Sequence, residues 1–205
     1  MDTNTHPIRF SIEYPDRTLN RTTTALRLVA ALPVLLVLAA VSGGTWEWSH
    51  DSGEAVAAGA GGILFFGPLL MLVFRGTYPR WWFDFNLELE RFTNRVVAYV
   101  ALLDDRYPSV TDGQSVRLDY PEPEGLSRWL PLVKWLLAVP HYAVLVVLHA
   151  GAVLAVVAAW FAILVTGRYP RPLFDYVTGV LRWSNRVKGY AFTLVTDRYP
   201  PFSLR

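Results

Sequence analysis

The chain has 205 residues, of which 53% are hydrophobic and only 18% are charged. This charged fraction is below the roughly 25% usual in soluble domains, so the composition indicates a membrane protein. The chain has no cysteine, which excludes disulfide frameworks, iron–sulfur clusters and thiol nucleophiles, and its net charge of +2 is too small to indicate a nucleic-acid partner.

Two short segments alternate between apolar and polar residues and predict strands. The first, IRFSIEY, lies near 8–14, and the second, SVRLDY, near 115–120. Each is stopped by a proline. The spacing leaves open whether the two strands pair with each other or with other segments.

Long apolar segments predict four membrane crossings, two in each half of the chain. The first pair is expected at about 22–42 and 55–75, and the second pair at about 126–148 and 151–166. The second pair needs a tight turn at 149–151, because one helix over the whole apolar run would overshoot a hydrocarbon core of about 30 Å. The alternative for this run is a re-entrant hairpin.

Basic residues at the start of the third crossing are expected to extend toward the membrane surface. Arg128 and Lys134 lie in its first turns, where long side chains snorkel to the interface. Lys134 is six positions before Pro140, and Arg27 is six positions before Pro33. This matching spacing indicates that the two halves are related.

Each pair of apolar segments is followed by a similar block of sequence. Residues 77–108 read TYPRWWFDFNLELERFTNRVVAYVALLDDRYP, and residues 168–200 read RYPRPLFDYVTGVLRWSNRVKGYAFTLVTDRYP. Apolar positions at helical spacing predict amphipathic helices at about 83–104 and 174–196 that lie in the membrane interface.

The fold class predicted is therefore an all-α transmembrane protein built from a duplicated unit. The first repeat covers 1–110 and the second covers 111–205, each with two crossings and one interfacial amphipathic helix. All 19 Lys and Arg lie outside the two predicted loops at about 43–62 and 149–151. By the positive-inside rule, a multi-pass protein with both termini in the cytoplasm is expected.

A motif repeated in both blocks is a candidate lipid-headgroup site. Two arginines one helical turn apart and an intervening asparagine offer charged and amide donors to an anionic headgroup. The alternative is a solvated basic face paired with nearby acids. The six candidate residues are Arg91, Asn94, Arg95, Arg182, Asn185 and Arg186.

Three histidines are the other candidate functional residues. His141 and His149 interrupt the apolar run, and an intramembrane histidine is a functional hypothesis by default. His141 could instead bond a carbonyl that Pro140 leaves free. His50 and His149 are expected on the outer side, where a metal site is an alternative. The leading prediction includes no metal, no cofactor and no catalytic residue.

The block at 168–204, with KWLLAVPH at 134–141, resembles a bacterial membrane family known as domain of unknown function 4389. The likeness covers about 115–205, and the first half reads as a more divergent copy. Thr77 stands there in place of Arg168, and no histidine follows Pro33. The resemblance implies an integral protein of the bacterial cell membrane and brings no catalytic residues.

The function expected from these patterns is non-enzymatic. We expect an accessory or scaffold subunit that binds anionic membrane lipids and a larger membrane protein complex, or associates with itself. The first alternative is a small oligomeric transporter or channel. The second is an enzyme of lipid metabolism with a histidine-based outer site.

Overall fold

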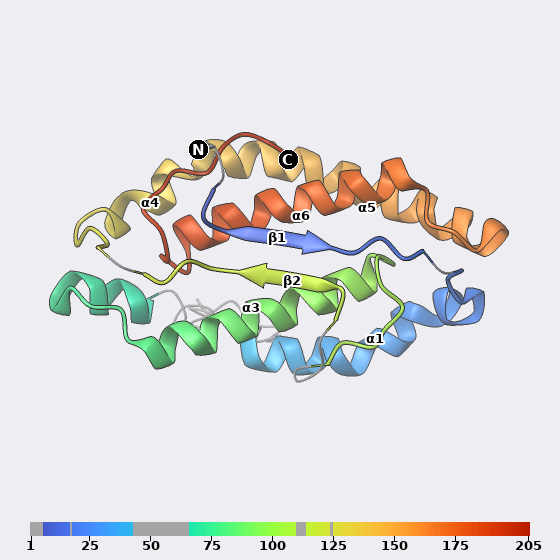
Figure 1. The fold of residues 1–205 in the computed structure, drawn as a ribbon, viewed down its shortest axis with the longest axis horizontal. Coiled ribbons are helices and arrows are strands. Elements are labelled where there is room, and N and C mark those ends of the chain that lie inside the picture. The colour runs from blue at the N-terminus through green and yellow to red at the C-terminus, as the bar shows by residue number, and fades with distance from the viewer. Residues whose placement is uncertain (1–5, 17, 43–65, 110–113, 124) are drawn as a thin grey trace, which may run out of the picture.

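The computed structural model describes residues 6–16, 18–42, 66–109, 114–123 and 125–205. Within them, Figure 1 shows two strands running through the middle of an elongated arrangement of helices. The elements in chain order are β1 (Arg9–Ile12), α1 (Arg21–Ser42), η1 (Met71–Arg75), α3 (Arg80–Val100), β2 (Val116–Asp119), α4 (Pro131–Leu137), α5 (Val139–Thr166) and α6 (Arg171–Ala191).

The two predicted strands are confirmed, and they pair with each other. β1 and β2 are antiparallel, with Arg9 opposite Asp119 and Ile12 opposite Val116. Alternate residues are buried along both strands, as expected for a sheet covered on one face. Ser11 and Arg117 lie opposite each other on the exposed face. The sheet therefore has one apolar and one polar side.

The predicted amphipathic helices are confirmed as helices, and each packs against a strand and an apolar helix, while their placement in the membrane interface stays a prediction. α3 packs against β2 and α6 packs against β1, while their other sides contact α1 and α5. More than half of α6 is buried, including Phe174, Val180 and Trp183. α6 is therefore an interior helix, whereas α3 is covered on two sides but keeps Trp81 and Phe85 exposed. The apolar periodicity of the sequence predicted only one covered side on each of these helices.

The first apolar helix is confirmed, since α1 covers Arg21–Ser42. Its start is capped by Asn20, whose side-chain oxygen accepts from the backbone N–H of Thr22 at 2.9 Å. α1 then runs alongside α3, where Ala31 and Val34 share a buried cluster with Val96. Residues 55–65 of the predicted second crossing lie outside the described residues, and Phe66–Arg75 is helical.

The predicted turn at 149–151 is wrong, and so is the re-entrant hairpin, because α5 continues without interruption from Val139 to Thr166. Gly151 serves close helix packing instead of a turn. A Cβ atom added there would lie 2.5 Å from the hydroxyl of Tyr176 on α6. The excess length of the apolar run is divided between α4 and α5, which meet at Ala138.

Two described helices, Arg21–Val41 and Val139–Thr166, are long and apolar enough to cross a membrane. From top to bottom of the view in Figure 1, the elements follow in the order α5, α6, β1, β2, α3, α1, and α1 and α5 also contact each other. α3 and α6 therefore lie between the sheet and the two apolar helices. This layering decides which residues are accessible on each side of the molecule.

Candidate functional site

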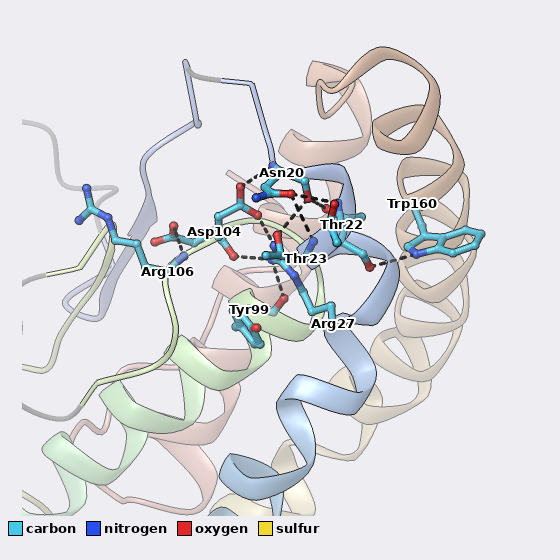
Figure 2. Close-up of polar contacts among 10 residues, drawn as sticks. Asn20, Thr22, Thr23, Arg27, Tyr99, Asp104, Arg106 and Trp160 are labelled. Carbon is cyan, nitrogen blue, oxygen red and sulfur yellow. Dashed lines mark hydrogen bonds and ion pairs between the residues drawn. The ribbon is translucent and has the colours of Figure 1, made fainter.

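A buried arginine ties the start of α1 to the end of α3. Arg27 is only 1% exposed. Its guanidinium donates to the carbonyl oxygens of Tyr99 at 3.2 Å and Asp104 at 2.6 Å, and it forms an ion pair with Asp105. It also lies over the Tyr99 ring, 4.6 Å from the centroid. Figure 2 shows this side chain directed from α1 into the turn that follows α3.

A buried lysine makes the matching contacts in the second half. Lys134 is fully buried, donates to the carbonyl oxygen of Thr196 at 2.8 Å, and forms an ion pair of 2.7 Å with Asp197. Its ammonium lies 5.3 Å from the centroid of the Tyr190 ring. Burial lowers the pKa of Lys134, and the Asp197 carboxylate opposes that shift. The predicted snorkelling of Lys134 is therefore wrong.

The acidic partners belong to the repeated Asp-Arg-Tyr-Pro sequences. Asp105 and Asp197 each open one copy of that tetrapeptide. The chain reaches them through Leu102 and Leu194, the non-glycine residues with positive φ, at 65° and 57°, in the part of the chain the structure describes. In these turns, backbone carbonyls point toward the buried Arg27 and Lys134 side chains. The equal spacing of Arg27 and Lys134 to the prolines that follow them indicated that these two residues correspond. It did not identify their acidic partners.

The two asparagines of the candidate headgroup site bond to each other. The side-chain nitrogen of Asn94 donates to the oxygen of Asn185 at 2.8 Å, and Asn185 returns a bond of 2.7 Å. Both residues are buried. This reciprocal pair joins α3 to α6 and leaves neither amide facing an open surface.

The four arginines of the same candidate site donate to this chain's own carbonyls. Arg91 bonds the carbonyl of Leu118 on β2, and Arg182 bonds that of Phe10 on β1. Arg95 donates to Ser109, and Arg186 donates to Ser203 and Arg205 near the chain's end. The repeated motif therefore holds the strands and the C-terminal segment in place. A headgroup would have to compete with these acceptors.

Among the described residues, His141 and His149 have separate partners. His141 is buried and accepts a 3.0 Å bond at Nδ1 from the Trp183 indole, while its ring stacks on Phe202 at 4.0 Å. It was expected to bond a carbonyl freed by Pro140, so this contact is a correction. His149 donates from Nδ1 to the Leu145 carbonyl at 2.7 Å. His50 lies outside the described residues.

An apolar groove of about 550 Å³ lies between α1 and α5. Its lining comes from α1, α3, α5, α6 and the turn after α3, and includes Leu28, Leu35, Val153 and Val157. The few polar residues there are already bonded. Thr24, for example, donates its hydroxyl to the carbonyl of Asn20 at 2.8 Å. The groove therefore offers contact to an apolar chain and few donors to a polar ligand.

Across the described ranges, no group of three or more His, Asp or Glu is placed to hold a metal ion. A protein-family model described as a domain of unknown function (DUF4389) matches residues 129–203, which include α4, α5 and α6. No curated protein and no solved structure gives a significant match. The second half of the chain is therefore similar to a family whose description assigns no activity.

Proposed function

We propose that this chain is a non-enzymatic membrane protein, an accessory or scaffold subunit that contacts lipids and a larger membrane complex through α1 and α5. The observation that carries the proposal is the direction of the side chains on these helices. Arg27, the charged residue within α1, is buried. Large apolar residues are exposed instead, among them Leu28, Leu36, Val147 and Leu154 at 68–71%.

This arrangement is the reverse of that in a water-soluble protein. Monomeric soluble proteins rarely expose a large continuous apolar patch, and such patches mark contact with lipid or another protein. We name the outward residues of α1 and α5, among them those four, the apolar face. In this proposal the apolar face contacts lipid and partner, and the sheet faces water.

We further propose that the two halves are copies of one unit. The matching contacts of Arg27 and Lys134 support this, as do the reciprocal bonds between Asn94 and Asn185. We place the protein in the bacterial cell membrane with both termini in the cytoplasm, in agreement with the distribution of Lys and Arg. The headgroup site at the six motif residues stays a prediction.

The alternatives have less support from the geometry. A transporter or channel needs a polar path, and the groove between α1 and α5 is lined almost entirely by apolar side chains. A histidine-based enzyme needs ionisable groups that meet, whereas His141 is enclosed by Trp183 and Phe202.

Membrane fractionation with matched variants tests the proposal. The wild-type chain should stay with membranes in high salt and alkaline carbonate and be released by detergent. Leu154→Glu and Val147→Glu place a charge on the apolar face and should weaken retention, whereas Ser11→Glu on the exposed sheet face should not. A chain that is soluble and monodisperse without detergent would contradict membrane association.

Gentle purification from native membranes separates the scaffold from the channel. A stoichiometric larger membrane protein that is lost with Leu154→Glu and kept with Ser11→Glu supports the scaffold. A lone homo-oligomer that conducts ions in reconstituted vesicles contradicts it.

A further inference from the structure

The polar sheet lies level with the middle of α5. His149, near the centre of that helix, approaches Ser184 of α6 at 3.3 Å. Two residues earlier on α6, Arg182 donates to the carbonyl of Phe10 in β1 at 3.0 Å. These contacts place the centre of the sheet beside the central turns of α5, not beyond either of its ends.

A transmembrane orientation of α5 would therefore take the sheet into the hydrocarbon. On its exposed side, Arg117 forms a 2.7 Å ion pair with Glu13, and the two side chains are 69% and 65% exposed. Ionisable groups in the bilayer interior are costly unless they face protein or a water-filled cavity. Sheet edges exposed to lipid do not occur there either. This orientation conflicts with the fold.

The apolar helices have the composition expected for a long contact with lipid along their sides. α5 contains no Asp, Glu, Lys or Arg, and α1 contains only Arg21 at its start and the buried Arg27. The 28 residues of α5 extend about 42 Å at 1.5 Å per residue, which exceeds a hydrocarbon core of about 30 Å.

Basic and aromatic residues lie at the borders of the proposed contact between the apolar helices and lipid. Arg21 lies at the start of α1 and Arg168 just after α5, whereas Arg75 ends η1 and Arg128 precedes α4; all four are exposed. Trp129, which is 71% exposed, lies two residues before the start of α4. Arginine at an apolar border favours anionic headgroups, and tryptophan favours the membrane interface. This combination fits a lipid surface better than a second apolar protein face.

We propose that α1 and α5 lie parallel to the membrane plane, with the apolar face embedded in one leaflet rich in anionic lipid and neither helix crossing the bilayer. The sheet and both ends of α5 then face the same aqueous compartment. The inference rests on the proposed membrane association and replaces the multi-pass topology for these two helices. The groove between α1 and α5 would be filled by acyl chains of that leaflet.

Single-cysteine labelling tests this orientation, because the chain has no native cysteine. Arg128→Cys and Arg168→Cys place thiols before and after the α4–α5 segment, Ser11→Cys marks the sheet, and Leu154→Cys marks the apolar face. A membrane-impermeant maleimide is applied to sealed inside-out and right-side-out membrane vesicles. Carbonate-resistant retention of each variant is measured first and serves as the control for membrane association and folding.

The in-plane arrangement predicts that Arg128→Cys, Arg168→Cys and Ser11→Cys react in the same vesicle orientation. Leu154→Cys should react only after detergent is added. Labelling of Arg128→Cys and Arg168→Cys from opposite sides would overturn the in-plane arrangement and leave membrane association intact. Loss of carbonate-resistant retention in the wild-type chain would overturn both.

A fluorophore on Leu154→Cys distinguishes lipid from protein as the occupant of the apolar face. The protein is reconstituted into vesicles of phosphatidylcholine and phosphatidylglycerol that carry nitroxide-labelled acyl chains. Quenching of this fluorophore, without quenching of one on Ser11→Cys, supports lipid contact. An unquenched fluorophore at Leu154→Cys would show that a second copy covers the face and would overturn the proposal.

Discussion

Asn94 and Asn185 exchange two side-chain hydrogen bonds of 2.8 Å and 2.7 Å between α3 and α6. Each amide nitrogen also donates to a backbone carbonyl one turn earlier on its own helix, Asn94 to Glu90 and Asn185 to Leu181. Both side-chain amides are buried, so water cannot take the place of a hydrogen-bond partner that is lost. The pair joins α3 to α6 and is one of several contacts between the two halves of the chain.

The free energy of unfolding lost in the two single asparagine variants should add up to more than the loss in the double variant. Asn94→Leu leaves the buried oxygen of Asn185 without its donor, which costs about 1–3 kcal/mol. The double variant Asn94→Leu, Asn185→Leu removes both polar groups, and its loss should be smaller than the sum of the single losses. Chemical unfolding in detergent measures all three, with Ser11→Ala as the control. Strict additivity would contradict a direct coupling.

Lys134 should contribute more to stability than an exposed basic residue. Lys134→Met leaves Asp197 without its cation, and loss of one partner of a buried pair costs about 3–5 kcal/mol. The cost should fall toward the lower end because Asp197 is 30% exposed. Arg117→Met breaks an exposed pair and should cost less than about 1 kcal/mol.

The double variant Lys134→Met, Asp197→Leu provides the internal control for this ion pair. It removes the unpaired carboxylate, so it should recover part of the stability lost in Lys134→Met. Equal losses for Lys134→Met and Arg117→Met in unfolding experiments would show that the buried contact is not stabilising.

His6 should make the fold sensitive to mild acid. The backbone N–H of Ile8 donates to Nδ1 of His6 at 3.3 Å, and Nε2 lies 3.3 Å from the carbonyl of Arg198, so the geometry fits the neutral ring. Burial is the main cause that lowers the pKa of His6 below its ordinary value of 6.5. The unfolded chain therefore binds more protons than the folded chain as the pH falls below 6.5, and stability declines.

The melting temperature between pH 7.5 and pH 5 measures this effect. The wild-type chain should lose stability as the pH falls through 6.5 and below, while His6→Asn should show a weaker dependence over that range. Identical profiles for the two proteins would exclude His6 as the cause. His149→Asn, which changes an exposed histidine, serves as the matched control.

Gly189 should not tolerate a methyl group unless Ile8 is shortened. A Cβ atom at Gly189 would lie 2.1 Å from Cδ1 of Ile8 and 3.4 Å from its Cγ1. Gly189→Ala should therefore destabilise the fold by about 1–3 kcal/mol, as overpacking of a core does. Ile8→Val removes the Cδ1 atom, so the pair Gly189→Ala, Ile8→Val should lose less than the two single variants combined. No rescue in thermal unfolding would place the strain elsewhere.

Local patterns predicted most of the secondary structure. Alternation predicted both strands, and helical spacing predicted α3 and α6 to within four or five residues at their ends. Pro79 and Pro170 occupy the positions just before the first residues of these helices. These signals depend on residues close together in the chain, and for that reason they can be recognised without a structure.

Interactions between distant residues could not be predicted in the same way. The turn expected at His149–Gly151 rested on the length of the apolar run, and no local signal showed that Tyr176 would need the space beside Gly151. The acceptors of the arginines in the repeated motif could not be identified from the sequence, because carbonyls such as those of Phe10 and Leu118 are far away in the chain.

By itself, the sequence determined that this protein has apolar helices, two short strands and a repeated amphipathic block, because hydrophobic periodicity and proline act within a few residues. Only the tertiary structure decided that Arg27 and Lys134 turn inward and that the polar sheet lies level with the middle of α5. The physical reason is that a charged side chain takes the best partner within reach in space. Its partners here are Asp105 and Asp197, which folding alone brings close.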